Sequence, residues 1–136
     1  RHLYLIDSCP TLSGTRKVWH FDLDNSGNPS NQTLVYDFGG GRGGDGMRLD
    51  SEGNIYVAAG IMNPRGEHET NEVPPGIYVI NPSGDLIARI PIGEDVITNL
   101  AFGGTDGKTI YVTAGKTIYT ARVSIAGQVS YPNWSE

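Results

Sequence analysis

The stretch 44–59, GDGMRLDSEGNIYVAA, begins with a carboxylate between two glycines. The glycine run 39–44, which leads into this stretch, is expected to let backbone come close to the opening beside Asp45. An ionised carboxylate in such a place can bind a hard divalent cation or take a proton from water. Composition and spacing leave a second interpretation equally open, in which Asp45 only caps a turn.

Four other side chains are candidates for contact with a substrate. Thr98 and Asn99 occupy the position that corresponds to Asp45 in the next copy of the repeat described below. Arg65 and His68 belong to the loop 60–75, which is longer than ordinary hairpin loops. This loop is either a lid over the site or a solvated charged excursion, and the second interpretation is the simpler one.

Other chemistries are poorly supported. The glycine run 39–44 lacks the Lys-Ser/Thr ending of a phosphate-binding loop and does not open a helix. The segment 22–27 begins like a calcium loop, but Thr33 stands where the bidentate glutamate should be, so a hairpin turn is expected. The sequence contains no Gly-x-Ser-x-Gly motif, and its three histidines show no metal-ligand spacing: His2, His20 and His68.

The elements that position these residues are all β-strands. Tyr4, Tyr56 and Tyr111 recur at intervals of roughly 50 residues, each in a strand-like run that is followed by a second aromatic strand. No stretch shows sustained helical periodicity. A repeat of this length with four short strands is typical of a β-propeller blade.

The blade count indicates a partial propeller. The pieces run roughly over 1–38, 45–92 and 97–131, with innermost strands at 46–50 and 98–102. The chain starts at the second strand of its first blade, and only 128–131 remains for a fourth strand of the last. We therefore predict just under three four-stranded antiparallel blades of an expected six, within one domain. Three blades cannot close a ring.

Strand order predicts which loops surround Asp45, because antiparallel strands return the chain to the same face of the disc. The loops on that face are 8–16, 39–44, 60–75, 93–98 and the turn at Gly115. The turns 51–53, 81–84 and 105–108 lie on the opposite face.

The composition limits the classes of partner that the protein is expected to bind. A net charge of −5 and scattered basic residues argue against nucleic acid, and no apolar run is long enough to span a membrane. A soluble protein of the cytoplasm or the periplasm is expected.

Three stretches resemble the gluconolactonase and senescence marker protein (regucalcin) family. They are 45–58 (DGMRLDSEGNIYVA), 98–104 (TNLAFGG) and 5–8 (LIDS). The resemblance implies the C-terminal half of a six-bladed propeller that hydrolyses small sugar lactones with one divalent metal ion on its axis. Calcium is the expected metal, with zinc and magnesium as alternatives. Asp45 would bind the metal and act as base on the attacking water.

The family's other metal ligands, a glutamate near the N-terminus and asparagines of intermediate blades, have no counterpart in this chain. The implied partner is therefore the missing half of the propeller, from the same precursor or from another chain. The alternative is a non-catalytic propeller fragment that serves in binding or assembly.

Overall fold

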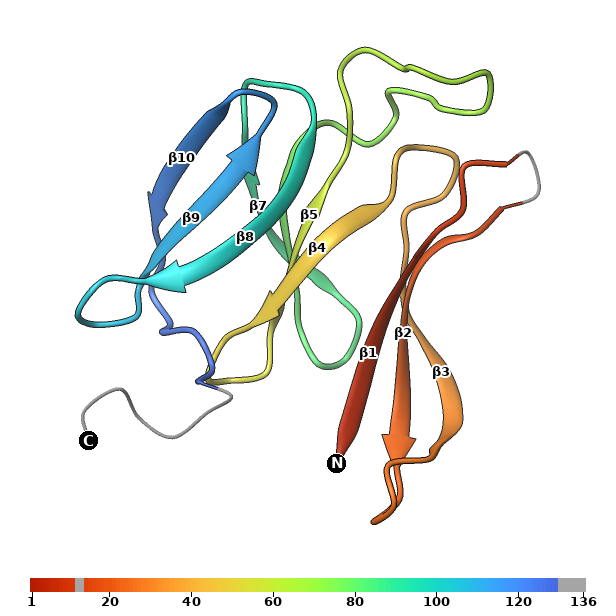
Figure 1. Cartoon of the computed structure of the whole chain (residues 1–136), viewed down its shortest axis with the longest axis vertical. Helices are drawn as coiled ribbons and strands as arrows, with labels where there is room; N and C mark the ends of the chain where they lie inside the picture. Colours follow the sequence, from red (N-terminus) through yellow and green to blue (C-terminus); the bar gives the residue numbers. More distant parts are fainter. Residues whose placement is uncertain (12–13, 130–136) are drawn as a thin grey trace.

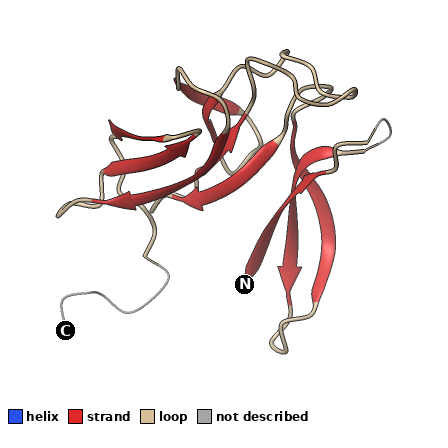
Figure 2. Cartoon of the chain, turned by 45° about the horizontal axis from the view of Figure 1, so that its top comes forward, coloured by secondary structure: helices blue, strands red, loops and turns tan. Residues whose placement is uncertain are grey.

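The computed structural model describes residues 1–11 and 14–129, and these form strands, turns and loops without a helix. Ten strands make three antiparallel sheets, ordered β1-β2-β3, β4-β5-β6-β7 and β8-β9-β10. Figures 1 and 2 show the sheets side by side like sectors of a fan. The all-β, partial-propeller prediction is confirmed. The strands are β1 (His2–Ser8), β2 (Arg16–Leu23), β3 (Pro29–Asp37), β4 (Gly44–Leu49), β5 (Ile55–Ala59), β6 (Gly76–Ile80), β7 (Leu86–Pro91), β8 (Ile97–Gly103), β9 (Thr109–Ala114) and β10 (Thr117–Arg122).

The two central strands of the middle sheet, β5 and β6, are buried at every position, and the packing of β5 explains why its sequence is apolar throughout. Ile55, Val57 and Ala59 pack in one core with Val18 and Phe38 of the first blade. Tyr56 and Ala58 point to the other side and pack in a second core, with Ile97, Leu100, Ile110, Val112 and Ala114 of the last blade. Side chains alternate across a strand, so one strand supplies both cores.

The outer faces of the two end sheets are less covered. Leu3 and Leu5 of β1 are about two-fifths exposed, and Tyr111 and Ile118 of β9 and β10 are more exposed still. These side chains alternate with residues that face the middle sheet. Each end sheet therefore buries one face only within the described residues.

The strand assignments agree with the repeat. The innermost strands expected at 46–50 and 98–102 are β4 and β8, and Tyr4, Tyr56 and Tyr111 lie in the strands that follow the innermost position. No fourth strand pairs with β10 among the described residues. Instead, the Gln128 N–H donates to the Leu49 carbonyl at 2.9 Å, which joins this segment to the end of β4. Residues 130 and 131 of the expected strand lie outside the described part.

A recurring turn closes the hairpins at the opposite end of the disc. Asp24, Asp50 and Asn81 each accept backbone N–H groups two and four residues further along. A glycine with positive φ follows three residues after each of them: Gly27, Gly53 and Gly84. Asn and Asp side chains often hold turns in this way. The expected hairpin turn at 22–27 is thus confirmed.

The loops 39–44, 60–75 and 93–98 and the described parts of 8–16 gather at the end of the fan where β4 begins, the upper edge in Figure 1. The turn between β9 and β10, which contains Gly115, lies there as well, while the turns 51–53, 81–84 and 105–108 lie at the other end. The expected separation of loops between the two faces is confirmed. No described segment forms a helix of the length and apolarity that would cross a lipid bilayer.

Candidate active site

A β-bulge places Asp45 at the mouth of the sheet. Gly44 pairs with Ala59 and Met47 pairs with Val57, so Asp45 and Gly46 together stand opposite one residue of β5. Such a bulge bends the strand and redirects a side chain. The Asp45 side chain is 45% exposed as a result.

The innermost strand of the last blade repeats this arrangement. Ile97 pairs with Ala114 and Asn99 pairs with Thr113, which leaves Thr98 as the extra residue. The Thr98 hydroxyl is 2.8 Å from the hydroxyl of Thr113, and the Asn99 Oδ1 accepts the N–H of Leu100 at 2.9 Å. The two bulges therefore stand at equivalent places in neighbouring blades.

Gly46 allows the two innermost strands to approach each other. A Cβ atom on Gly46 would lie 2.3 Å from the Asn99 Oδ1 and 2.9 Å from its Cα, distances that real Cβ atoms do not show. The missing side chain thus brings Asn99 next to the residue that follows Asp45. The sequence predicted close backbone approach at the glycine run 39–44, and the structure shows a close approach at Gly46 too, toward a neighbouring strand.

A pocket of about 280 Å³ lies beside Asp45. Its walls come from β1, β4 and three of the loops expected on this face, and the lining residues are Ile6, Ser8, Pro10, Arg16, Arg42, Gly43, Gly44, Asp45 and Glu69. The opening is polar, with two arginines and two carboxylates in contact with it. A small polar molecule is the kind of ligand that such a lining suits.

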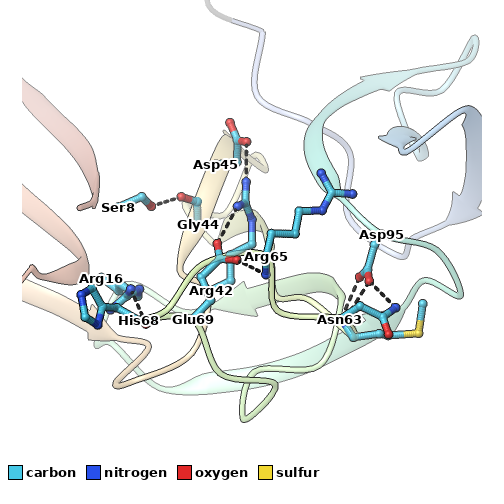
Figure 3. A network of polar contacts seen from close by, with 11 residues as sticks. Ser8, Arg16, Arg42, Gly44, Asp45, Asn63, Arg65, His68, Glu69 and Asp95 are labelled. Atoms are coloured by element: carbon cyan, nitrogen blue, oxygen red, sulfur yellow. Dashed lines mark hydrogen bonds and ion pairs between the residues drawn. The ribbon is translucent and has the colours of Figure 1, made fainter. Parts of the chain in front are cut away.

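One guanidinium group links the two carboxylates (Figure 3). Arg42 Nη2 is 3.5 Å from the Asp45 Oδ2, and Arg42 Nη1 is 3.1 Å from the Glu69 Oε1. Glu69 also accepts the backbone N–H of Arg65 at 2.8 Å through its Oε2. This backbone hydrogen bond, followed by the hydrogen bond and charge of Arg42, lowers the pKa of Glu69 although burial acts to raise it.

Arg16 and Ser8 shape the opposite wall. Arg16 is buried, and its Nη2 donates to the carbonyl oxygen of His68 at 3.0 Å. The Ser8 hydroxyl donates to the carbonyl of Gly44 at the start of β4. Figure 3 shows His68 beside Arg16, on the far side of Glu69 from Asp45. Among the described residues, the lining of the pocket includes neither His68 nor Arg65.

The loop 60–75 is fastened at a second place, to the loop before β8. The Asp95 carboxylate accepts the N–H groups of Met62 and Asn63 at 2.7 and 2.9 Å, and the Asn63 side-chain amide at 2.9 Å. Burial acts to raise the pKa of Asp95, but these donors together outweigh it and hold that pKa below its usual value. Figure 3 shows the Arg65 side chain reaching out between Asp45 and Asp95.

The site offers carboxylate oxygen, the type of ligand atom that binds a hard cation. Asp45 is exposed to the pocket, and within the described residues its Oδ2 faces Arg42 while no hydrogen bond reaches its Oδ1. Carboxylate oxygen suits calcium or magnesium. Calcium takes ~6–8 oxygen ligands, so Asp45 would hold such an ion as one ligand among several.

Sequence reasoning missed Arg16, Arg42 and Glu69 as site residues. In the sequence, Arg42 lies within the glycine run 39–44 and Arg16 is the last residue of the expected loop 8–16, so neither stands out as a site residue. The available signal was the placement of loops 8–16, 39–44 and 60–75 on one face, because each loop contains or adjoins one of these charged residues.

Comparison with known proteins identifies related chains. The family model described as SMP-30/Gluconolactonase/LRE-like region matches residues 1–116. A gluconolactonase from Zymomonas mobilis is 27% identical over 118 residues, which cover 81% of this chain and 29% of that protein.

Two solved structures share the fold. A luciferin-regenerating enzyme superposes with a TM-score of 0.62 at 30% identity, over 83% of this chain and 33% of its own. A calcium-binding protein, regucalcin, from Agrobacterium tumefaciens gives a TM-score of 0.63 at 20% identity, over 93% of this chain and 47% of its own. The chain thus spans less than half the length of these relatives.

Proposed function

Because the chain belongs to the SMP-30/gluconolactonase/LRE-like family, we propose that it forms part of a metal-dependent lactonase that hydrolyses small sugar lactones. The observation that carries the proposal is the exposed Asp45 carboxylate at a polar pocket that also holds the guanidinium of Arg42. The named lactonase among its relatives supports the substrate class.

Lactone hydrolysis needs a base, a stabiliser of negative charge and a proton donor. Water attacks the carbonyl carbon, and the carbonyl oxygen becomes an oxyanion while the water loses a proton. The ring C–O bond then breaks, and the ring oxygen leaves as a hydroxyl after it takes up a proton. The product is an open hydroxy acid.

Asp45 accepts the proton of the attacking water in this proposal, because its carboxylate is exposed to the pocket. Arg42 lies 3.5 Å from that carboxylate and presents N–H donors that can bind the oxyanion. The proton on Asp45 can then pass to the departing ring oxygen. Arg65 and His68 remain candidates for contact with a larger substrate, and Thr98 and Asn99 with its far side.

The divalent cation, calcium in the first place with zinc or magnesium as alternatives, would be held by Asp45 and would polarise the lactone carbonyl when bound. Among the described residues that line the pocket, Glu69 already accepts hydrogen bonds at both carboxylate oxygens, so Asp45 is the carboxylate that fits that role. We therefore propose that the remaining ligands come from the blades that complete the propeller, either in the same polypeptide or in a partner chain. A second copy of this chain is one such partner.

Lactone hydrolysis by a preparation that contains this chain tests the proposal. Glucono-δ-lactone is followed by acid release in a pH-stat, first after treatment with a chelator and then after separate addition of Ca²⁺, Mg²⁺ and Zn²⁺. Restoration of a rate above the spontaneous one supports the assignment. A rate that chelation leaves unchanged contradicts metal dependence, and no rate with any metal contradicts the lactonase.

A second candidate is a non-catalytic binding or assembly module. The exposed apolar side chains on the outer faces of the first and last sheets favour it, since they suit contact with another blade. Size-exclusion chromatography with metal analysis separates the two candidates. An assembly of higher mass with bound metal supports the enzyme, and a metal-free assembly without lactonase rate supports the module.

A further inference from the structure

A cluster of two histidines and an aspartate lies on the first sheet, at the end remote from Asp45. His2 of β1 pairs directly with Asp22 of β2, and His20 lies two residues from Asp22 on the same face of the strand. One ligand atom from each of the three side chains lies within 4.8 Å of the others. Histidine spacing along the chain gave no sign of this cluster, because cross-strand pairing creates it.

The three atoms form a triangle of the size that a metal ion requires. His20 Nε2 is 2.9 Å from His2 Nδ1, His2 Nδ1 is 3.4 Å from Asp22 Oδ1, and His20 Nε2 is 3.9 Å from Asp22 Oδ1. A point equidistant from all three lies about 2.0 Å from each, which is the length of a Zn–N or Zn–O bond.

Neighbouring groups already orient two of the three ligands. The other ring nitrogen of His20 is 3.2 Å from the Thr33 hydroxyl. The second carboxylate oxygen of Asp22 accepts the Asn31 side-chain amide at 3.0 Å. Hydrogen bonds of this kind fix ligand orientation in metal sites.

A β-bulge supplies the Asn31 contact. His20 pairs with Thr33 and Asp22 pairs with Ser30, so β3 carries an extra residue at this point. Asn31 has a φ of 51°, which among described residues other than glycine is the sole positive value. Bulges redirect side chains, and here the bulge turns an amide onto a carboxylate.

We propose that His2, His20 and Asp22 form a second metal site, for Zn²⁺ or a divalent ion of similar chemistry. Two imidazoles and one carboxylate suit zinc better than calcium, which prefers oxygen ligands alone. His20 is 21% exposed, and His2 and Asp22 are more open at 62% and 45%, so the fourth position faces solvent. The ion would join the first strand of the chain to the second.

This site is separate from the Asp45 pocket. Ser8 lies at the opposite end of β1 from His2 and lines the pocket, while none of the three proposed ligands does so. Zinc binding here is therefore independent of the lactonase proposal. It can be tested without any activity measurement.

Isothermal titration of the chelator-treated, untagged chain with Zn²⁺ tests the proposal. We expect one zinc per chain and a loss of affinity of more than about 100-fold in His20→Ala and in Asp22→Asn, since even outer-shell changes alter metal affinity 10–100-fold. His2→Gln should also lower the affinity for zinc, although His2 is the most exposed of the three residues. His68→Ala and Glu67→Gln, a histidine and an exposed carboxylate of the loop 60–75, are the matched controls and should retain the wild-type affinity.

Two further measurements distinguish a site formed by all three ligands from zinc binding to a single exposed histidine. Zn²⁺ should raise the midpoint of thermal unfolding of the wild type but not of His20→Ala, because binding to the folded state stabilises it. Asn31→Gly keeps a residue that tolerates positive φ while it removes the amide, and should weaken zinc binding about tenfold. Binding lost in His2→Gln but retained in His20→Ala and Asp22→Asn would overturn the proposal, as would binding lost in His68→Ala.

Discussion

Asp45 and Glu69 are bound to the same guanidinium group, that of Arg42, at 3.5 and 3.1 Å. One carboxylate lies on an innermost strand, and the other lies in the long loop 60–75. Arg42 therefore couples the candidate catalytic residue to the position of this loop. A change in the loop that frees Arg42 would therefore alter the charge next to Asp45.

Replacement of Asp45 by asparagine should remove lactone hydrolysis. Loss of the proton acceptor lowers kcat by roughly 10²–10⁴, the usual contribution of a general base. The matched control is Asp85→Asn, which changes an exposed carboxylate in a turn at the other end of the disc. Equal rates for Asp45→Asn and the control, measured with glucono-δ-lactone in a pH-stat, would rule out Asp45 as the base.

The hydrogen bond between Glu69 and the Arg65 N–H should weaken in acid. The pKa of Glu69 is lowered below its ordinary 4.5 in the folded chain. The stabilisation is therefore complete above pH 4.5 and is lost as the pH falls through the lowered pKa. Hydrogen exchange of the Arg65 amide should show this loss of protection, after correction for the intrinsic pH dependence of exchange.

Glu69→Gln should show weak protection of the Arg65 amide at every pH, because the charged acceptor is gone. Glu67→Gln is the control, since Glu67 is an exposed carboxylate of the same loop. A Glu69→Gln variant with the wild-type pH profile would show that this carboxylate does not hold the loop.

Asp95 should protect the loop 60–75 from proteolysis. Asp95→Ala removes three hydrogen bonds to Met62 and Asn63, so the segment that leads to Arg65 should open more often. We expect trypsin to cleave after Arg65 about fivefold faster, which corresponds to a loss of about 1 kcal/mol at a partly exposed site. Glu67→Ala should cleave at the wild-type rate, and an unchanged rate for Asp95→Ala would refute the anchor.

The buried turn at Asp50 should matter more for stability than the equivalent exposed turn at Asp24. Both carboxylates accept two backbone N–H groups and one asparagine side-chain amide. Asp50 is 1% exposed, so Asp50→Ala leaves buried donors without a partner and should lower the free energy of unfolding by about 2–3 kcal/mol. Asp24→Ala should cost clearly less in the same urea titration. Equal losses would show that burial does not set the difference.

The sequence was informative wherever the structure depends on residues that are close to one another along the chain. Period-two alternation, the polar turn signals between the strands and the tyrosine repeat predicted the strands, the hairpins and the partial propeller. Strand order alone then placed the loops on their two faces. The glycines beside Asp45 marked the innermost strand of the middle blade, and the structure shows that one of them admits Asn99.

The contacts that complete the site were decided by the tertiary structure. Arg42 meets Glu69 across 27 residues and Arg16 meets His68 across 52, while His2, His20 and Asp22 meet through the register of one hairpin and a bulge in its neighbour. Local patterns determine which face a side chain takes, because the strand repeats every two residues. They do not determine the path of a long loop or the register of a bulge, since a shift of one residue there changes every partner.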